Sequence, residues 1–129
     1  MAGQISVPIL DMTFKSFGDQ RSNQFHFQEL KATDVVQRTS AVTAVAIGIL
    51  QNQPNSGGTA TVRLFGITKV KSGVAITFGN LVGTNAGGAG MAVTPGSETT
   101  QYISAAALES VSSGDIVSVA ISPIVHRAA

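Results

Sequence analysis

The sequence predicts an all-β protein, a compact small barrel or sandwich of short strands. Apolar and polar residues alternate with a period of two in several short segments, and clusters of Gly, Pro, Asn and Asp separate these segments. One turn pattern also occurs three times, at residues 31–36, 77–82 and 112–117. Each copy has a small residue, then Asp or Asn, then two aliphatic residues. Since Asp and Asn bond nearby backbone N–H groups and tolerate turn geometry, each copy predicts a turn that starts a strand.

Residues 1–22 contain apolar residues without a sustained helical or strand period. Two interpretations stay open: an extended N-terminal arm that packs on another molecule, or a terminal strand of the chain's own sheet. We divide the chain on the first interpretation, into an arm (1–22) and a β-barrel-like domain (23–129). The apolar residues of the arm are its candidate contacts: Ile5, Val7, Ile9, Leu10, Phe14 and Phe17.

The next strands are predicted from alternation. Residues 25–30 form a strand with Phe25 and Phe27 on one face, and a short strand begins at residue 35. Two strands then flank the loop 52–58, which indicates a hairpin-like connection over 47–70. A lone glycine in the second of these strands, Gly66, indicates a bulge or the close approach of another backbone.

The second half follows the same plan. Strands are predicted at 74–78, at 81–82, as a short segment at 91–93 and at 116–121. The run 83–90, GTNAGGAG, is predicted to be a loop, because no phosphate-binding motif or helix follows it. Residues 102–110 are compatible with a helix, but a strand is preferred because the run is short and a Gly-Asp turn follows it. Pro123 indicates an edge or the end of the last strand.

The composition is low in charge. Charged residues make up 12% of the 129 residues and the net charge is +1, whereas soluble domains average about 25% charged residues. Such a surface favours association, so we expect it to be covered by copies of the chain or by a partner; a charge-poor β domain is the alternative. The absence of cysteine excludes disulfide and thiolate chemistry. The first residues lack the features of a secretory signal, and no apolar run is long enough to span a bilayer.

No motif predicts an enzyme, a metal site or a cofactor. The two histidines, His26 and His126, are 100 positions apart and lack metal-binding spacing. The seven acidic residues are dispersed singly, and no serine lies in a GxSxG motif. Three basic residues, Arg63, Lys69 and Lys71, form only a weak cluster for nucleic acid, so solvated strand faces are the preferred interpretation.

Several segments together resemble the head decoration (capsid cement) proteins of tailed bacteriophages. The resemblance extends over roughly residues 19–123, and its most specific part is Ile47-Gly48-Ile49-Leu50-Gln51-Asn52-Gln53-Pro54. Further similarity lies in the segments 24–30, 59–63, 66–70, 107–109 and 114–119. The chain departs from the family pattern at Asn80, where Asp is more usual. Members of this family have often been labelled as recombinases, but this chain has no Walker-type loop and no basic face to support that label.

The resemblance implies a non-enzymatic virion protein that binds the outer surface of the capsid, commonly as a homotrimer. Its partner would be the major capsid protein, and it would stabilise the shell by bridging neighbouring capsid subunits. Deletion of residues 1–17 is then expected to leave a folded domain that no longer binds capsids. Two alternatives are another virion, shell or tail subunit and a nucleic-acid-binding phage protein. No membrane partner is expected.

Overall fold

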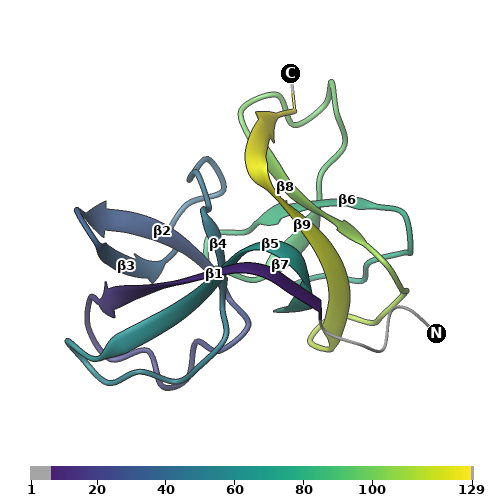
Figure 1. The fold of residues 1–129 in the computed structure, drawn as a ribbon. Helices are drawn as coiled ribbons and strands as arrows, with labels where there is room; N and C mark the ends of the chain where they lie inside the picture. Colours follow the sequence, from purple (N-terminus) through teal and green to yellow (C-terminus); the bar gives the residue numbers. More distant parts are fainter. Residues whose placement is uncertain (1–6, 129) are drawn as a thin grey trace.

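A computed structural model describes the backbone of residues 7–128 and the side chains of residues 10–121 and Ala128. Within this range the chain forms nine β-strands and no helix, which confirms the all-β prediction (Figure 1). The strands are β1 (Val7–Ser16), β2 (Phe27–Ala32), β3 (Val35–Arg38), β4 (Gly48–Leu50), β5 (Thr59–Lys71), β6 (Leu81–Thr84), β7 (Gly90–Ala92), β8 (Tyr102–Ala107) and β9 (Ile116–Arg127).

Five strands close a small barrel. Their order is β1-β3-β2-β4-β5, and β1 also pairs with β5, which completes the circle. The β1–β5 pairing is antiparallel and long, from Val7 opposite Ile67 to Lys15 opposite Thr59. The β1–β3 pairing is parallel and short, because only Lys15 and Ser16 have partners in β3. In the barrel, β1 therefore forms a long ladder with β5 and only a short ladder with β3.

The remaining strands extend the sheet from the far part of β5. From Gly66 onward, β5 pairs with β9, and the order then continues through β8, β6 and β7. Gly66 has φ +127°, a value that L-residues rarely adopt, and the register of β1 against β5 shifts beside it. This confirms the irregularity predicted at Gly66. It lies where β5 leaves the barrel and enters the second part of the sheet (Figure 1).

Two apolar cores result, one inside the barrel and one between its outer wall and the second part of the sheet. The barrel core contains Val36, Leu50, Ala60 and Val62, with Phe14, Ile47 and Leu64 packed against it. The second core contains Phe27, Ala46, Ile49, Val70, Ile76, Val82, Ala105, Ala107, Val117, Val119 and Ile121. Successive side chains in a strand point to opposite faces, so Ile49 and Leu50 of β4 fill different cores. This explains why all three residues of β4 are buried.

The three recurring turns are confirmed as starting points of strands. Asp34, Asn80 and Asp115 come directly before β3, β6 and β9. Asp34 has φ +59°, within the left-handed region that Asp tolerates. The Asn80 side chain bonds backward rather than forward: its Oδ1 accepts a hydrogen bond from the Thr77 N–H at 2.9 Å.

Several predicted details are wrong. Phe25 precedes β2 instead of sharing a face with Phe27, because its backbone has φ +64° and its N–H donates to the Leu50 carbonyl oxygen. Residues 74–78 make only an isolated bridge, between Ile76 and Val111. The strand predicted before the loop 52–58 is reduced to the three residues of β4. The predicted loop 83–90 contributes Gly83 and Thr84 to β6 and Gly90 to β7.

The N-terminal segment requires the main correction. Of the two interpretations left open by the sequence, the terminal strand describes residues 7–16, because β1 is a wall of the barrel. An arm separate from the barrel is therefore wrong for these residues. Deletion of residues 1–17 would remove β1 and its pairing with β5, so such a variant is expected to lose the barrel. Residues 1–6, including the candidate contact Ile5, lie outside the described part.

Candidate functional site

The uncovered part of β1 is the candidate site. Met12 and Phe14 lie opposite the buried residues Val62 and Ala60, so their side chains are on the inward face of the barrel. Phe14 reaches the barrel core, whereas Met12 and Leu10 lie before the point where β3 begins to cover β1. These two side chains are therefore 46% and 43% exposed. We call Leu10, Met12 and the cross-strand neighbour of Leu10, Phe65, the β1 surface.

The candidate contacts from the sequence fall into three groups. Leu10 and Phe17 are exposed, and the Lys31 ammonium lies 5.1 Å from the centre of the Phe17 ring. Phe14 is partly buried and packs against the barrel core. Val7 and Ile9 lie in β1, but their side chains are outside the described part, as is all of Ile5. Whether these residues contact a partner stays a prediction.

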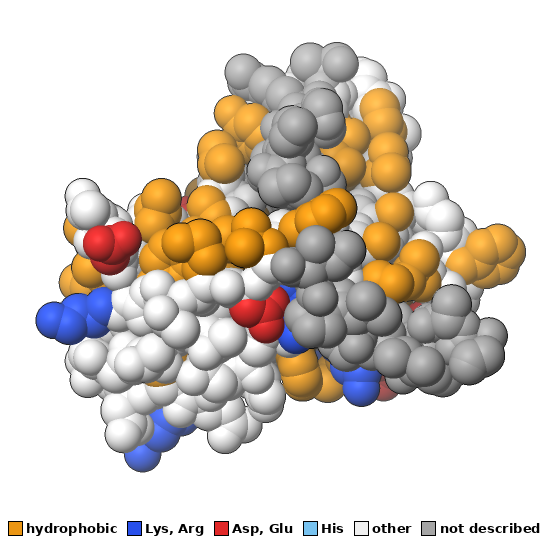
Figure 2. Space-filling view, in the orientation of Figure 1, with side chains coloured by type: hydrophobic (Ala, Val, Ile, Leu, Met, Phe, Trp, Pro, Cys, Tyr) orange, Lys and Arg blue, Asp and Glu red, His pale blue; other side chains and the backbone are white. Residues whose placement is uncertain are grey.

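Figure 2 shows hydrophobic side chains gathered in a band across this face of the molecule, with few charged side chains beside them. A contiguous apolar surface is a feature of interaction sites, whereas single exposed apolar residues are common everywhere. A second group of exposed apolar residues lies in the turns and strand ends of the second half of the chain, at Val74, Phe78, Leu108 and Ile116. Phe78 is 70% exposed in the turn before β6.

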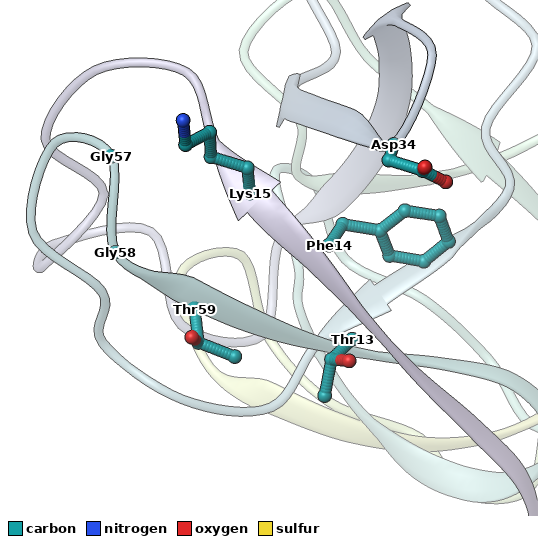
Figure 3. A pocket seen from close by; sticks show the side chains of 7 residues that line it. All are labelled: Thr13, Phe14, Lys15, Asp34, Gly57, Gly58 and Thr59. Carbon is teal, nitrogen blue, oxygen red and sulfur yellow. The ribbon is translucent and has the colours of Figure 1, made fainter.

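An open hollow of about 460 Å³ lies on the barrel beside the end of β1 (Figure 3). It is lined by Thr13, Phe14, Lys15, Asp34, Gly57, Gly58 and Thr59. Figure 3 shows Lys15 extending to the side of β1 away from Phe14 and Asp34. Small-molecule sites bring a few polar groups together in a largely enclosed pocket. This shallow hollow lacks such convergence, so it does not define a ligand site.

The basic cluster from the sequence is divided by the fold. Arg63 is buried and bonds Asp11 of β1 through two nitrogen–oxygen contacts of 2.8 and 3.1 Å. Hydrogen bonds from Ser118 lower the pKa of the Glu109 carboxyl, and the nearby Lys69 ammonium contributes a smaller shift in the same direction. Lys71 lies near His26, whose ring also lies within the field of Arg38. Arg63, Lys69 and Lys71 thus have separate neighbours and do not act as one basic cluster.

His26 is half-buried in the segment directly before β2. Burial lowers the pKa of His26, and the charges of Arg38 and Lys71 act in the same direction. Hydrogen bonds to the backbone of Gln24 and Asn23 oppose this shift. In the neutral ring, Nδ1–H donates to the Gln24 carbonyl oxygen at 3.1 Å. His26 therefore serves the structure of the turn before β2.

Among the described residues, no group of three or more His, Cys, Asp or Glu side chains is placed to hold a metal ion. The described part also has no helix long and apolar enough to cross a membrane.

Sequence reasoning missed Met12 and Phe65 as surface residues. Met12 alternates correctly with Leu10 and Phe14, so the period-two pattern of 10–14 was the available signal. In β5 the inward side chains alternate at Ala60, Val62 and Leu64, and Phe65 comes directly after them. Phe65 lies opposite Leu10 only because the register shifts between Leu10 and Asp11. No local pattern reveals that shift.

No protein-family profile matches the chain, and no curated protein matches it. A solved structure does: the N-terminal base of the head fiber protein gp8.5 in bacteriophage phi29. The TM-score is 0.66 at 15% sequence identity, and the match covers 88% of this chain and 94% of that one. At this identity the match shows a shared fold. It thus supports the compact all-β architecture predicted from the sequence.

Proposed function

We propose that this chain is a structural, non-enzymatic protein of a bacteriophage virion that binds the outer surface of the head. The observation that carries the proposal is the fold, which matches the base of a phage head fiber over most of both chains. The low charge and the exposed apolar residues of the β1 surface support an assembly role as well.

In the finer form of the proposal, the protein bridges neighbouring major capsid subunits and so resists the pressure of the packaged DNA. The β1 surface supplies apolar contact area, and the long antiparallel pairing of β1 with β5 holds that surface in place. Each contact can be weak, because many copies on a regular shell act together. We further propose that three copies associate on the shell.

Cosedimentation with mature phage heads tests the proposal. The purified chain is mixed with heads stripped of their surface proteins, and bound protein is measured in the pellet. Binding that saturates at a fixed ratio to the capsid subunit is expected, and light scattering of the free protein gives its oligomeric state. The proposal is wrong if the chain does not bind heads. Binding to tails, or self-assembly into filaments or shells, would then indicate another structural role.

A second candidate is the base of a fibre attached to the head, which the same structural match favours. The two functions differ in their effect on the shell. A bridging protein should raise the temperature at which heads release their DNA, because it adds contacts between capsid subunits. A fibre base should bind with saturation and leave that temperature unchanged.

A further inference from the structure

We propose that the free edge of β1 at Asp11 and Thr13 binds an extended segment of the partner protein by adding a strand to the barrel. This inference rests on the proposed function and specifies the type of contact. Strand addition joins main-chain groups of the partner to unpaired main-chain groups at the edge of a sheet.

The hydrogen bonds of β1 show which groups face this edge. The Ser16 N–H donates to Gly58 on the β5 side at 2.9 Å, whereas the Lys15 N–H donates to Asp34 on the β3 side at 2.8 Å. The register is regular from Asp11 to Lys15, so backbone direction alternates through this segment. The N–H and C=O groups of Asp11 and Thr13 therefore face the same side as those of Lys15.

The pairing across the barrel agrees with this assignment. Thr61, opposite Thr13, turns its main chain away from β1: its carbonyl oxygen accepts from the Gln51 N–H at 2.8 Å, and its N–H donates to Asn52 Oδ1 at 3.0 Å. Thr13 and Thr61 thus form a pair without mutual hydrogen bonds.

The strand β3 does not pair with Asp11 or Thr13, because its pairing with β1 begins at Lys15. Among the described residues, the outward main-chain groups of Asp11 and Thr13 have no hydrogen-bond partner. Asp11 and Thr13 are also exposed. Natural proteins usually cover or interrupt such an edge, and here the adjacent side chains Leu10 and Met12 are apolar and uncovered.

The length of the edge favours a flexible segment over a second copy of this chain. From Lys15 onward the edge is occupied by β3, so a second β1 in antiparallel pairing would meet β3 after about two residues. An extended segment of a capsid subunit can pair with Asp11 and Thr13 and place alternate apolar side chains against Leu10 and Met12.

A pair of variants at one position tests the inference. Proline removes one outward N–H, and proline is tolerated at a strand edge where the N–H faces solvent. Thr13→Pro is therefore expected to retain the fold and to lose at least tenfold in capsid affinity. Thr13→Val keeps the N–H with a side chain of similar shape and should bind like the parent chain.

Hydrogen exchange on the unmodified protein supplies an independent measurement. The amides of Asp11 and Thr13 should exchange fast in the free protein and become protected on capsids, while those of Met12 and Phe14 are slow in both states. Unchanged exchange at Asp11 and Thr13 on bound capsids overturns the inference, whatever the fold of Thr13→Pro. If those amides are instead protected in a self-associated form without capsids, a second copy occupies the edge. If the parent chain does not bind capsids at all, the proposed function fails first.

Discussion

Asp11 of β1 and Arg63 of β5 form a two-pronged ion pair across the barrel wall, with Nε–Oδ1 and Nη2–Oδ2 distances of 2.8 and 3.1 Å. The Arg63 side chain is 10% exposed and that of Asp11 is 30% exposed. Arg63 Nη1 also donates to the Ile67 carbonyl oxygen at 3.0 Å. One guanidinium thus joins β1 to the point where β5 leaves the barrel.

Asp11→Ala should lower the free energy of unfolding by about 1.5–3 kcal/mol, because a mostly buried guanidinium loses the carboxylate that accepts its hydrogen bonds. Chemical denaturation checks this value. Asp11→Asn keeps one hydrogen-bond acceptor for Arg63 and should therefore lose less stability than Asp11→Ala. An equal loss in the two variants would mean that the carboxylate charge alone accounts for the stabilisation.

Gly48→Ala should destabilise the barrel by about 1–3 kcal/mol or more, because a well-packed interior resists an added methyl group. A Cβ at this position would lie 2.3 Å from the backbone oxygen of Arg63 and 2.8 Å from Val62 Cγ1. Thermal unfolding measures the loss. Gly87→Ala is the control, since the nearest atom to its Cβ is Asn85 Oδ1 at 3.5 Å; a loss as large in the control would refute the steric account.

Stability should fall as the pH drops below about 6.5, the ordinary value for histidine. The pKa of His26 is lowered by burial, so the unfolded chain binds a proton before the folded chain does. The stabilising contribution is present above the unfolded pKa and is lost as the pH falls through the folded pKa. Urea midpoints at pH 7.5 and 5.5 measure the effect. His26→Gln should reduce the difference, and His126→Gln controls for the other histidine.

Leu10→Ser combined with Met12→Ser should weaken capsid binding while changing stability by about 0.5 kcal/mol per substitution, as is usual for surface positions. The reason is that both side chains supply apolar contact area at the β1 surface. Phe78→Ser is the matched control, because it removes an exposed apolar side chain far along the chain from β1, in the turn before β6. Loss of cosedimentation in Phe78→Ser alone would place the contact there.

The sequence predicts local features of this fold better than long-range ones. The turns at Asp34, Asn80 and Asp115 were predictable because their chemistry lies within a few residues. The role of residues 7–16 was not, because Val7 pairs with Ile67 sixty positions away and nothing in the local pattern selects that partner. Phe25 was misplaced because its left-handed backbone depends on bonds to Leu50 and Lys71.

The same distinction holds for the candidate site. Leu10 and Phe17 could be named from apolar character alone, and both are exposed. The reason for the exposure of Leu10 and Met12 is the short reach of β3 along β1, which is a property of the closed barrel. The assignment of Arg63 to an ion pair likewise needed the alignment of β1 with β5.

The continuity of β5 has a mechanical consequence. This single strand of 13 residues belongs to both parts of the sheet, through β1 and β4 on one stretch and β9 on the next. Tension applied to either part would reach the other along covalent bonds and as shear across ladders of hydrogen bonds, with no hinge loop between them. A pull on either part would therefore load the whole molecule at once, and the two cores should yield together as one unit.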